Sequence, residues 1–311
     1  MPINPHFAAT IGFFDGVHRG HQFLIECLKD EARRRGLHSM VITFAHHPRQ
    51  VVDPGWKPLL LSTPAEKEQL LRQTGIDRLV VLPFDRQTSQ LSAQEFMQQV
   101  LCRELHVGLL LTGYDNHFGH RTPGLSEGFS DYAAYGRKLG MEVMAARPYS
   151  PDGQCFSSSL VRSLVARGQM EEAARSLGRH YSLCGTVVHG HEVGRLLGYP
   201  TANIAVDNPL KLIPAQGVYA VTVGRQDSQG KDMAATPLPG MMNIGHRPTF
   251  DGQATTLEVH LFGFSGNLYG SSLSISFVSR LRDEQHFPSP QALARQMEAD
   301  AVKAQTILSN L

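Results

Sequence analysis

A chain of 311 residues is long for a single hydrophobic core, so we expect two domains. Its hydrophobic content of 41% and charged content of 18% are ordinary for a globular protein, and the net charge of +1 argues against a general nucleic-acid or membrane-surface binder. No apolar run approaches the roughly 20 residues that span a bilayer. The amino-terminal residues lack the pattern of a signal peptide, and the four scattered cysteines are typical of reduced core thiols. We therefore expect a cytoplasmic protein.

The first functional signal lies at residues 9–28. An apolar strand at 7–11 should run through a glycine turn into a helix that opens near His18. His18 and His21 are three positions apart, so they should point to the same side, and Gly20 between them lets a ligand approach the backbone. Because a helix amino terminus offers unpaired N–H groups and a partial positive charge, this pattern indicates a polyphosphate site. A surface histidine pair on a capped helix is the alternative.

Residues 12–21, with the sequence G-F-F-D-G-V-H-R-G-H, closely resemble the G-x-F-D-G-x-H-x-G-H motif of the bacterial bifunctional riboflavin kinases/FAD synthetases. The HxGH part is shared with the wider nucleotidylyltransferase superfamily. The resemblance implies that His18 and His21 are catalytic. It also implies that Gly12, Asp15 and Gly20 bind ATP and its phosphates.

Strands and helices alternate along the rest of the first half. Further strands are expected at 39–44, 78–83, 107–112 and 141–146, and helices at about 63–74, 92–104 and 130–139. Two of these helices begin with capping boxes, at Thr63–Glu66 and Ser92–Glu95. The alternation predicts a Rossmann-like, doubly wound parallel sheet, with ligands at the carboxyl ends of its strands.

Two more segments that follow strands should lie on that edge. Residues 43–49 resemble the family's T-F-x-P-x-P-R, with His46 replacing a proline; a metal site at this histidine pair lacks a third ligand at suitable spacing. Residues 113–119 resemble G-x-D-F-x-F-G, with Asn116 where an aromatic residue is common. That resemblance places Asp115, Phe118 and Gly119 on the flavin and adenine side.

Residues 156–162, F-S-S-S-L-V-R, resemble the family's I-S-S-T-x-I-R. Hydroxyl residues that open a helix, with an arginine on its first turn, can bind phosphate, so Ser157, Ser158 and Arg162 are further ATP-site candidates. This half shows no activated nucleophile. We therefore expect a substrate phosphate to attack the α-phosphorus of ATP directly, with Mg²⁺ helping to stabilise the pyrophosphate.

From about Tyr181 the pattern changes to short strands separated by Gly, Pro and Asn, expected at 182–188, 217–223, 257–264 and 273–278. It predicts a small closed antiparallel β-barrel. We place the domains at residues 1–180 and 181–311. A capped amphipathic helix from Pro290 should pack on the barrel or on the other domain.

The second motif is the glycine-rich segment 190–203. Gly190, Gly194 and Gly198 recur every four residues, which suits a loop whose N–H groups line phosphates, and Thr201 and Asn203 offer oxygens for Mg²⁺. A barrel hairpin with a long turn is the alternative. The segment closely resembles the riboflavin kinase motif G-x-x-x-G-R-x-L-G-F-P-T-A-N, which implies that Thr and Asn bind MgATP.

Glu258 is the candidate base of the second half. It alternates with Leu257 and Val259, so its side chain should face away from theirs, where a carboxylate can deprotonate a primary hydroxyl during γ-phosphoryl transfer. A solvated outward Glu is the alternative. The family's L-E-V-H strand implies the base role. Its other blocks imply a flavin side made by Asn243, Arg247, Arg282 and Phe287.

Together the motifs imply one enzyme that uses ATP and Mg²⁺. The barrel would phosphorylate riboflavin to FMN, and the Rossmann-like domain would adenylylate FMN to FAD. We expect no nucleic-acid or membrane partner, and a weak homo-oligomer is left open. The alternatives are an enzyme with one live activity, a non-catalytic flavin-binding regulator, and a cytidylyltransferase, which would leave residues 181–311 without a purpose.

Overall fold

The computed structural model describes residues 6–53, 55–113, 118, 127–190, 198–226, 236–249 and 252–311. The chain divides into two compact units between Ser158 and Ser159. This division falls before the domain boundary placed at residue 180, because helix α8 (Met170–Leu177) packs against the barrel strands β6 and β11. The functional boundary itself stays a prediction.

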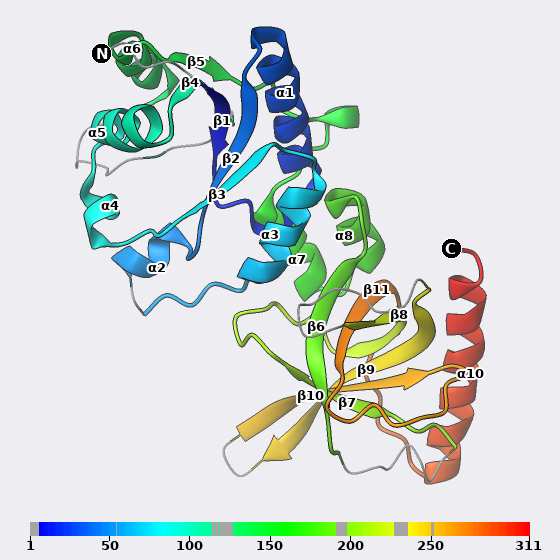
Figure 1. Ribbon diagram of the computed structural model, residues 1–311. Coiled ribbons are helices and arrows are strands. Elements are labelled where there is room, and N and C mark those ends of the chain that lie inside the picture. Colours follow the sequence, from blue (N-terminus) through cyan, green and yellow to red (C-terminus); the bar gives the residue numbers. More distant parts are fainter. Residues whose placement is uncertain are drawn as a thin grey trace. The chain divides into compact units, whose positions relative to one another are not determined.

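The first unit is built on a parallel sheet with the strand order β3-β2-β1-β4-β5 (Figure 1). The predicted doubly wound sheet is confirmed, and each predicted strand end lies within one residue of the observed one. Its strands are β1 (Phe7–Ile11), β2 (His38–Phe44), β3 (Arg78–Leu82), β4 (Val107–Thr112) and β5 (Glu142–Ala145).

Helices cover both faces of this sheet. Successive residues of β1 point to opposite sides, so Ala8 joins the core beneath α1 and α3 while Ala9 joins the core beneath α5 and α6. Figure 1 shows these two helix layers on either side of the strands. The helices of this part are α1 (Arg19–Arg35), α2 (Pro48–Val52), α3 (Pro64–Gln73), α4 (Arg86–Gln90), α5 (Ala93–Phe96) and α6 (Phe129–Leu139). Helix α7 (Ser158–Ala166) begins at the division, and all of it after Ser158 belongs to the second unit.

Both predicted capping boxes are present. The Thr63 hydroxyl accepts from the Glu66 N–H while the Glu66 carboxylate accepts from the Thr63 N–H, and Ser92 and Glu95 repeat the arrangement. The helix predicted from Ser92 is not regular throughout, because α5 continues as a π-helical segment at Met97–Glu104.

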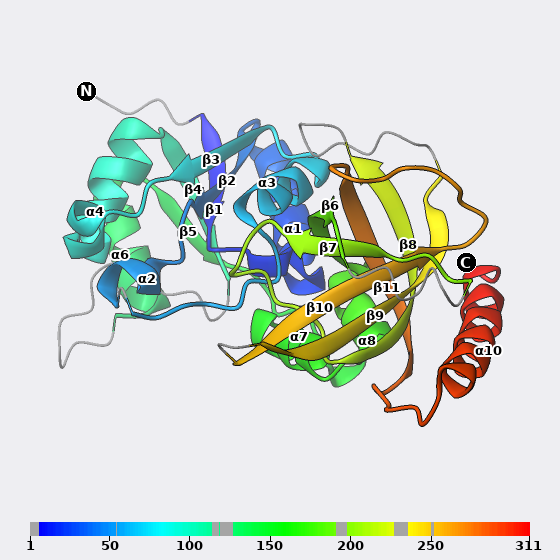
Figure 2. The same cartoon turned by 90° about the horizontal axis from the view of Figure 1, so that it is seen from below.

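The second unit is a closed barrel of antiparallel strands in the order β10-β7-β6-β11-β8-β9, as predicted (Figure 2). Strands β7 and β9 are not predicted from the sequence, and β9 contains two glycines and two prolines, which argue against a strand. The predicted terminal helix α10 (Pro290–Leu308) packs against β8, β9 and β11. The strands are β6 (Tyr181–Val188), β7 (Ala202–Val206), β8 (Gly217–Gln226), β9 (Leu238–Thr249), β10 (Gly252–Leu261) and β11 (Ser272–Arg282).

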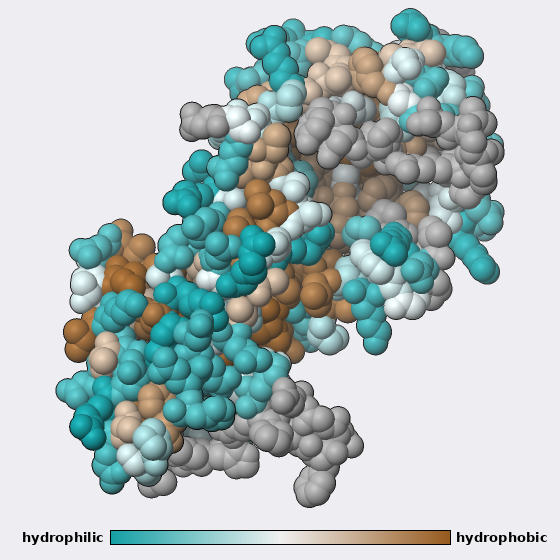
Figure 3. All heavy atoms as spheres, turned by 180° about the vertical axis from the view of Figure 1, so that it is seen from behind, coloured by the Kyte–Doolittle hydropathy of each residue, from teal (hydrophilic) through white to brown (hydrophobic). Residues whose placement is uncertain are grey.

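Within the described ranges, no helix is both long and apolar enough to cross a membrane. Hydrophilic side chains cover much of the face shown in Figure 3, with apolar patches between them. All four cysteines are free thiols.

Candidate active sites

The turn between β1 and α1 carries the predicted histidine pair. His18 caps the amino terminus of α1 and His21 lies in its first turn. Their rings stack with centroids 3.6 Å apart and planes 23° apart, which confirms the predicted common orientation. A Cβ added to Gly20 would lie 3.1 Å from the His18 ring, so only glycine fits beside that ring without a shift.

The His21 ring is held largely uncharged. Burial, and after it the neighbouring His18, keep the pKa of His21 well below its usual range. The Nδ1 atoms of both rings are buried. A neutral imidazole still has one N–H to donate, so His21 can donate one hydrogen bond to a phosphate oxygen without carrying a charge.

The turn that leads to these histidines is strained. Phe14 and Val17 have φ angles of 55° and 40°, in the left-handed region that a β-branched residue such as valine rarely adopts. Such a conformation persists only where its surroundings hold it. The ring of Phe14 packs edge-on against the His21 ring, with centroids 5.0 Å apart.

The Asp15 carboxylate supplies much of that support. It is 2% exposed and accepts hydrogen bonds from the backbone N–H groups of Leu61 and Ser62, each at 3.0 Å. The Ser62 hydroxyl in turn accepts from the Gly16 N–H at 3.0 Å. The resemblance implied phosphate binding for Asp15, whereas in the structure its carboxylate is engaged by the segment that precedes α3.

The other predicted residues of this site lie near the same turn or on α7. The Gly12 N–H donates to the Ile42 carbonyl at 3.1 Å. Ser157 directly precedes α7, and Ser158 opens it and donates to the Asp15 carbonyl at 3.0 Å. Arg162 lies one turn further along α7, where its Nη1 is 3.5 Å from the Ser159 hydroxyl.

Part of the predicted flavin and adenine loop can be placed. Phe118 stacks on the Tyr132 ring with centroids 4.3 Å apart. Asp115 and Gly119 lie outside the described residues. Of the histidine pair that follows β2, His47 caps α2, with its Nδ1 accepting from the Arg49 N–H at 3.2 Å.

In the barrel, Glu258 on β10 is the centre of a row of polar side chains. It pairs with Asn203 of β7 on one side and with Asn243 of β9 on the other. Directly opposed residues of antiparallel strands share a face, so the three side chains lie together on one face of the barrel wall. The Thr201 hydroxyl donates to Glu258 Oε2 at 3.3 Å. The sequence neighbours Leu257 and Val259 are buried, as their alternation with Glu258 predicts.

A pocket of about 290 Å³ opens beside this row. It brings together predicted residues from four separate segments: Thr201, Asn243, Glu258, Arg282 and Phe287. Its far wall is α10, through Leu293, Met297 and Asp300.

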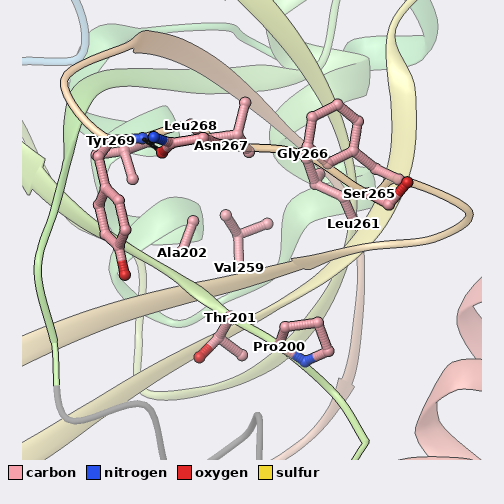
Figure 4. A pocket seen from close by; sticks show the side chains of 12 residues that line it. Pro200, Thr201, Ala202, Val259, Leu261, Ser265, Gly266, Asn267, Leu268 and Tyr269 are labelled. Carbon is pink, nitrogen blue, oxygen red and sulfur yellow. Dashed lines mark hydrogen bonds between the residues drawn. The ribbon is translucent and has the colours of Figure 1, made fainter.

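A second pocket, of about 480 Å³, adjoins it at Thr201, which lines both. Figure 4 shows the loop 265–269 along one side of this pocket and Pro200 and Thr201 along the other, with Val259 and Ala202 between them. Tyr269 at its edge stacks on His189, with ring centroids 3.9 Å apart.

The structure explains why glycine is needed at two of the predicted positions. The Asn203 side chain lies directly over Gly190, so any side chain at 190 would collide with it. Gly198 has a φ angle of +83°, which favours glycine. Gly194 lies outside the described residues, and of Arg247 only the backbone, in β9, is described.

Comparison with known proteins gives a separate family match for each half of the chain. The FAD synthetase family model matches residues 2–160, and the riboflavin kinase model matches residues 177–308. The bifunctional riboflavin kinase/FMN adenylyltransferase of Escherichia coli is 35% identical over 295 residues, covering 95% of this chain and 90% of that protein. The Pseudomonas fluorescens protein of the same name is 38% identical, covering 96% and 92%. The chain belongs to the bifunctional riboflavin kinase/FMN adenylyltransferase family.

Riboflavin kinase and FMN adenylyltransferase are therefore the two activities of this enzyme, which converts riboflavin to FMN and FMN to FAD with ATP as co-substrate. Among solved structures, a Streptococcus pneumoniae protein described as a macrolide-efflux protein has the same fold. It is 30% identical with a TM-score of 0.86, and the alignment covers 97% of this chain and 95% of that one.

Sequence analysis missed Asp300, an acidic residue that lines the smaller of the two barrel pockets. Asp300 of α10 has a side chain only 5% exposed and accepts from Arg282 Nε at 2.9 Å and Nη2 at 2.8 Å. The helical spacing could have indicated this residue, because Asp300 follows Met297 by three positions and so lies on the apolar face of α10. A carboxylate on the buried face of a helix requires a partner, and Arg282 is that partner.

Proposed function

We propose that each reaction of this enzyme uses one of the two sites described above, the histidine turn for adenylyl transfer and the Glu258 row for riboflavin phosphorylation. The observation that carries the proposal is the Thr201–Glu258 contact at the junction of two pockets, matched in the other unit by the stacked histidines on a helix amino terminus. We assign the adenylyltransferase to residues 1–180 and the kinase to residues 181–311.

In the kinase site, the smaller pocket suits riboflavin and the larger one ATP. The isoalloxazine ring would lie against Phe287 and α10, with Asn243 and Arg282 on the flavin side. Arg247 remains a predicted member of the flavin side. The primary hydroxyl of the ribityl chain would reach Glu258, which orients it and accepts its proton as the γ-phosphoryl group is transferred. ATP would enter beside the loop 265–269, with its phosphates toward Thr201 and the Gly190–Gly198 segment.

The donor set at the junction of the pockets fits Mg²⁺. Thr201 and Asn203 bring a hydroxyl and an amide oxygen beside the Glu258 carboxylate, and hard oxygen donors are those that Mg²⁺ prefers. We propose Thr201 and Asn203 as its protein ligands. When bound there, Mg²⁺ would neutralise charge on the ATP phosphates.

In the adenylyltransferase site, the FMN phosphate would attack the α-phosphorus of ATP and displace pyrophosphate. The rings of His18 and His21 would donate N–H groups to phosphate oxygens at the positive end of α1, beside the close backbone approach at Gly12 and Gly20. The lowered pKa of His21 keeps that ring neutral as it does so. Ser157, Ser158 and Arg162 would supply further phosphate donors. Asp115, Phe118 and Gly119 would face the flavin and adenine. We propose that Asp15 holds the turn and contributes to phosphate binding only through it.

A time course separates this proposal from a single-activity enzyme. The protein is incubated with riboflavin, ATP and Mg²⁺, and FMN and FAD are separated and quantified. We expect FMN to appear first and FAD to follow, with both lost when Mg²⁺ is chelated and regained when it is restored. Accumulation of FMN alone would contradict the assignment of the first site, and unchanged rates after chelation would contradict the metal assignment.

The Arg282–Asp300 pair gives a prediction for the flavin pocket. Asp300→Ala leaves a largely buried guanidinium without its carboxylate, so we expect a loss of about 3 kcal/mol in the free energy of unfolding. Because Arg282 lines the pocket, the KM for riboflavin should rise about tenfold, which corresponds to about 1.4 kcal/mol of binding.

The matched control is Glu298→Ala, which removes an exposed carboxylate from the same helix and should leave both quantities unchanged. Steady-state kinetics with riboflavin and urea unfolding measure the two effects. A stability loss with no change in KM would assign Asp300 to the fold alone. Adenylylation of supplied FMN serves as the internal standard, because it does not use this pocket.

We also propose that the enzyme acts in the cytoplasm on free flavins and ATP, without a nucleic-acid or membrane partner. Its four free thiols and its net charge of +1 support this. Weak self-association remains a prediction.

A further inference from the structure

Lys67 of α3 is a buried cation beside the adenylyltransferase turn, and neither the sequence motifs nor the proposed roles use it. It is 3% exposed. Its Nζ donates to the carbonyl of Phe44, the last residue of β2, at 2.8 Å. The same Nζ lies 3.9 Å from the centroid of the Phe13 ring, a distance at which the face of an aromatic ring attracts a cation.

These contacts join Lys67 to both loops at the carboxyl edge of the sheet. Phe13 begins the strained turn that leads to His18, and Phe44 ends the strand before His46 and His47. Phe14, next to Phe13, packs against the His21 ring. Three residues before α3, Leu61 begins the pair of N–H donors that engage Asp15. The start of α3 therefore holds the turn at two points, on either side of Phe14.

Burying the Lys67 ammonium group costs free energy, because it removes the charge from water. Burial lowers the pKa of Lys67 to about 8, and the negative charges of Asp15 and then Glu68 offset this only in part. The charged form is thus disfavoured by folding, while a methionine of similar length would meet no such cost. What the charge adds is the attraction to the Phe13 ring and a stronger hydrogen bond to the Phe44 carbonyl.

We propose that Lys67 is a positioning residue for adenylyl transfer, whose ammonium group locks Phe13 and the end of β2 so that the strained turn presents His18 and His21 to the ATP phosphates. The inference rests on the proposed role of the histidine pair. It adds that the reaction needs the charged form of a side chain that touches neither substrate.

The proposal predicts an alkaline limit on FAD formation. As the pH rises through about 8, Lys67 loses its proton and with it the attraction to Phe13. The charged groups that face Lys67 are Asp15 from the turn and Glu68 from its own helix. His47 packs against the Phe13 ring, with the two ring centroids 4.7 Å apart. Riboflavin phosphorylation uses the same nucleotide in the other unit, so it provides the internal reference for any effect of pH on ATP.

The test compares Lys67→Met, Lys67→Arg and the control Lys138→Met, an exposed lysine on α6. For each, kcat is measured for FAD formation from FMN and for FMN formation from riboflavin, between about pH 6.5 and about pH 9.5. In the unmodified enzyme, FAD formation should fall above about pH 8 while FMN formation does not. Lys67→Met should lower FAD formation about tenfold to a hundredfold at neutral pH and abolish the alkaline fall, with FMN formation unchanged. Lys67→Arg should restore part of the rate and keep it constant to the highest pH, because a guanidinium stays protonated.

Thermal unfolding distinguishes positioning from a purely structural role. Because the pKa of Lys67 is lowered from 10.5 to about 8, the unfolded chain binds more protons between these values, so this lysine opposes folding at neutral pH and less so as the pH rises. Lys67→Met should therefore keep or raise Tm at neutral pH, and the unmodified enzyme should gain stability relative to it between about pH 8 and about pH 10.5.

Several outcomes would overturn the inference: a normal FAD rate in Lys67→Met, an unchanged alkaline fall in Lys67→Arg, or a Met variant that loses Tm and both activities together. Should Lys67→Met fail to fold, the pH profile of Lys67→Arg decides by itself. An enzyme that makes no FAD, or that makes it equally well without His21, would instead contradict the proposed function of the site.

Discussion

Replacing His21 by alanine should remove FAD formation and leave riboflavin phosphorylation intact. The ring stacks on His18 and burial lowers its pKa, so its proposed contribution is a neutral hydrogen-bond donor to the phosphates. Loss of one such preorganised donor costs about 10²- to 10³-fold in kcat. The measurement is the rate of FAD formation from FMN and ATP, beside the rate of FMN formation from riboflavin in the same preparation.

His38→Ala is the control, because His38 is an exposed histidine at the start of β2, away from the turn. It should leave both rates unchanged. His21→Asn retains a polar N–H donor, so it should recover part of the rate that His21→Ala loses. Such a recovery would show that the loss in His21→Ala comes from the missing donor and not from misfolding. If a folded His21→Ala enzyme lost both activities, or neither, the assignment of the histidine pair to adenylyl transfer would be incorrect.

Replacing Glu258 by glutamine should produce the opposite pattern. The amide keeps the shape of the side chain and can still contact Thr201, but it cannot accept a proton from the riboflavin hydroxyl. General-base catalysis contributes about 10²- to 10⁴-fold, so FMN formation should fall by that factor while supplied FMN is still converted to FAD. Because the shape of the pocket is retained, the KM for riboflavin should change little.

The control for this variant is Glu171→Gln on α8, an exposed glutamate in the same unit. Fluorescence titration with riboflavin would show that the flavin still binds to Glu258→Gln. A full rate of phosphorylation in this variant would assign the proton transfer to another group. A loss of flavin binding would instead indicate that Glu258 holds the substrate.

The sequence predicted best those features that depend on residues close together in the chain. The two capping boxes, the strand at 107–112 and the common side of His18 and His21 depend on neighbours within one helical turn or one strand, and all were predicted. Strand β9 was missed because its two glycines and two prolines disfavour an isolated strand, whereas pairing with β8 and β10 inside a closed barrel supplies the stabilisation that its own residues lack.

By itself the sequence determined the two-part architecture, the positions of the two long motifs and the family, because motif spacing and hydrophobic period are properties of consecutive residues. Only the tertiary structure decided that the Asp15 carboxylate is used by Leu61 and Ser62, that Arg282 is paired with Asp300, and that a lysine on α3 lies against Phe13. In each case the partners are separated by 18 to 54 residues of chain, and which of many charged side chains becomes buried beside a given turn depends on how whole helices pack.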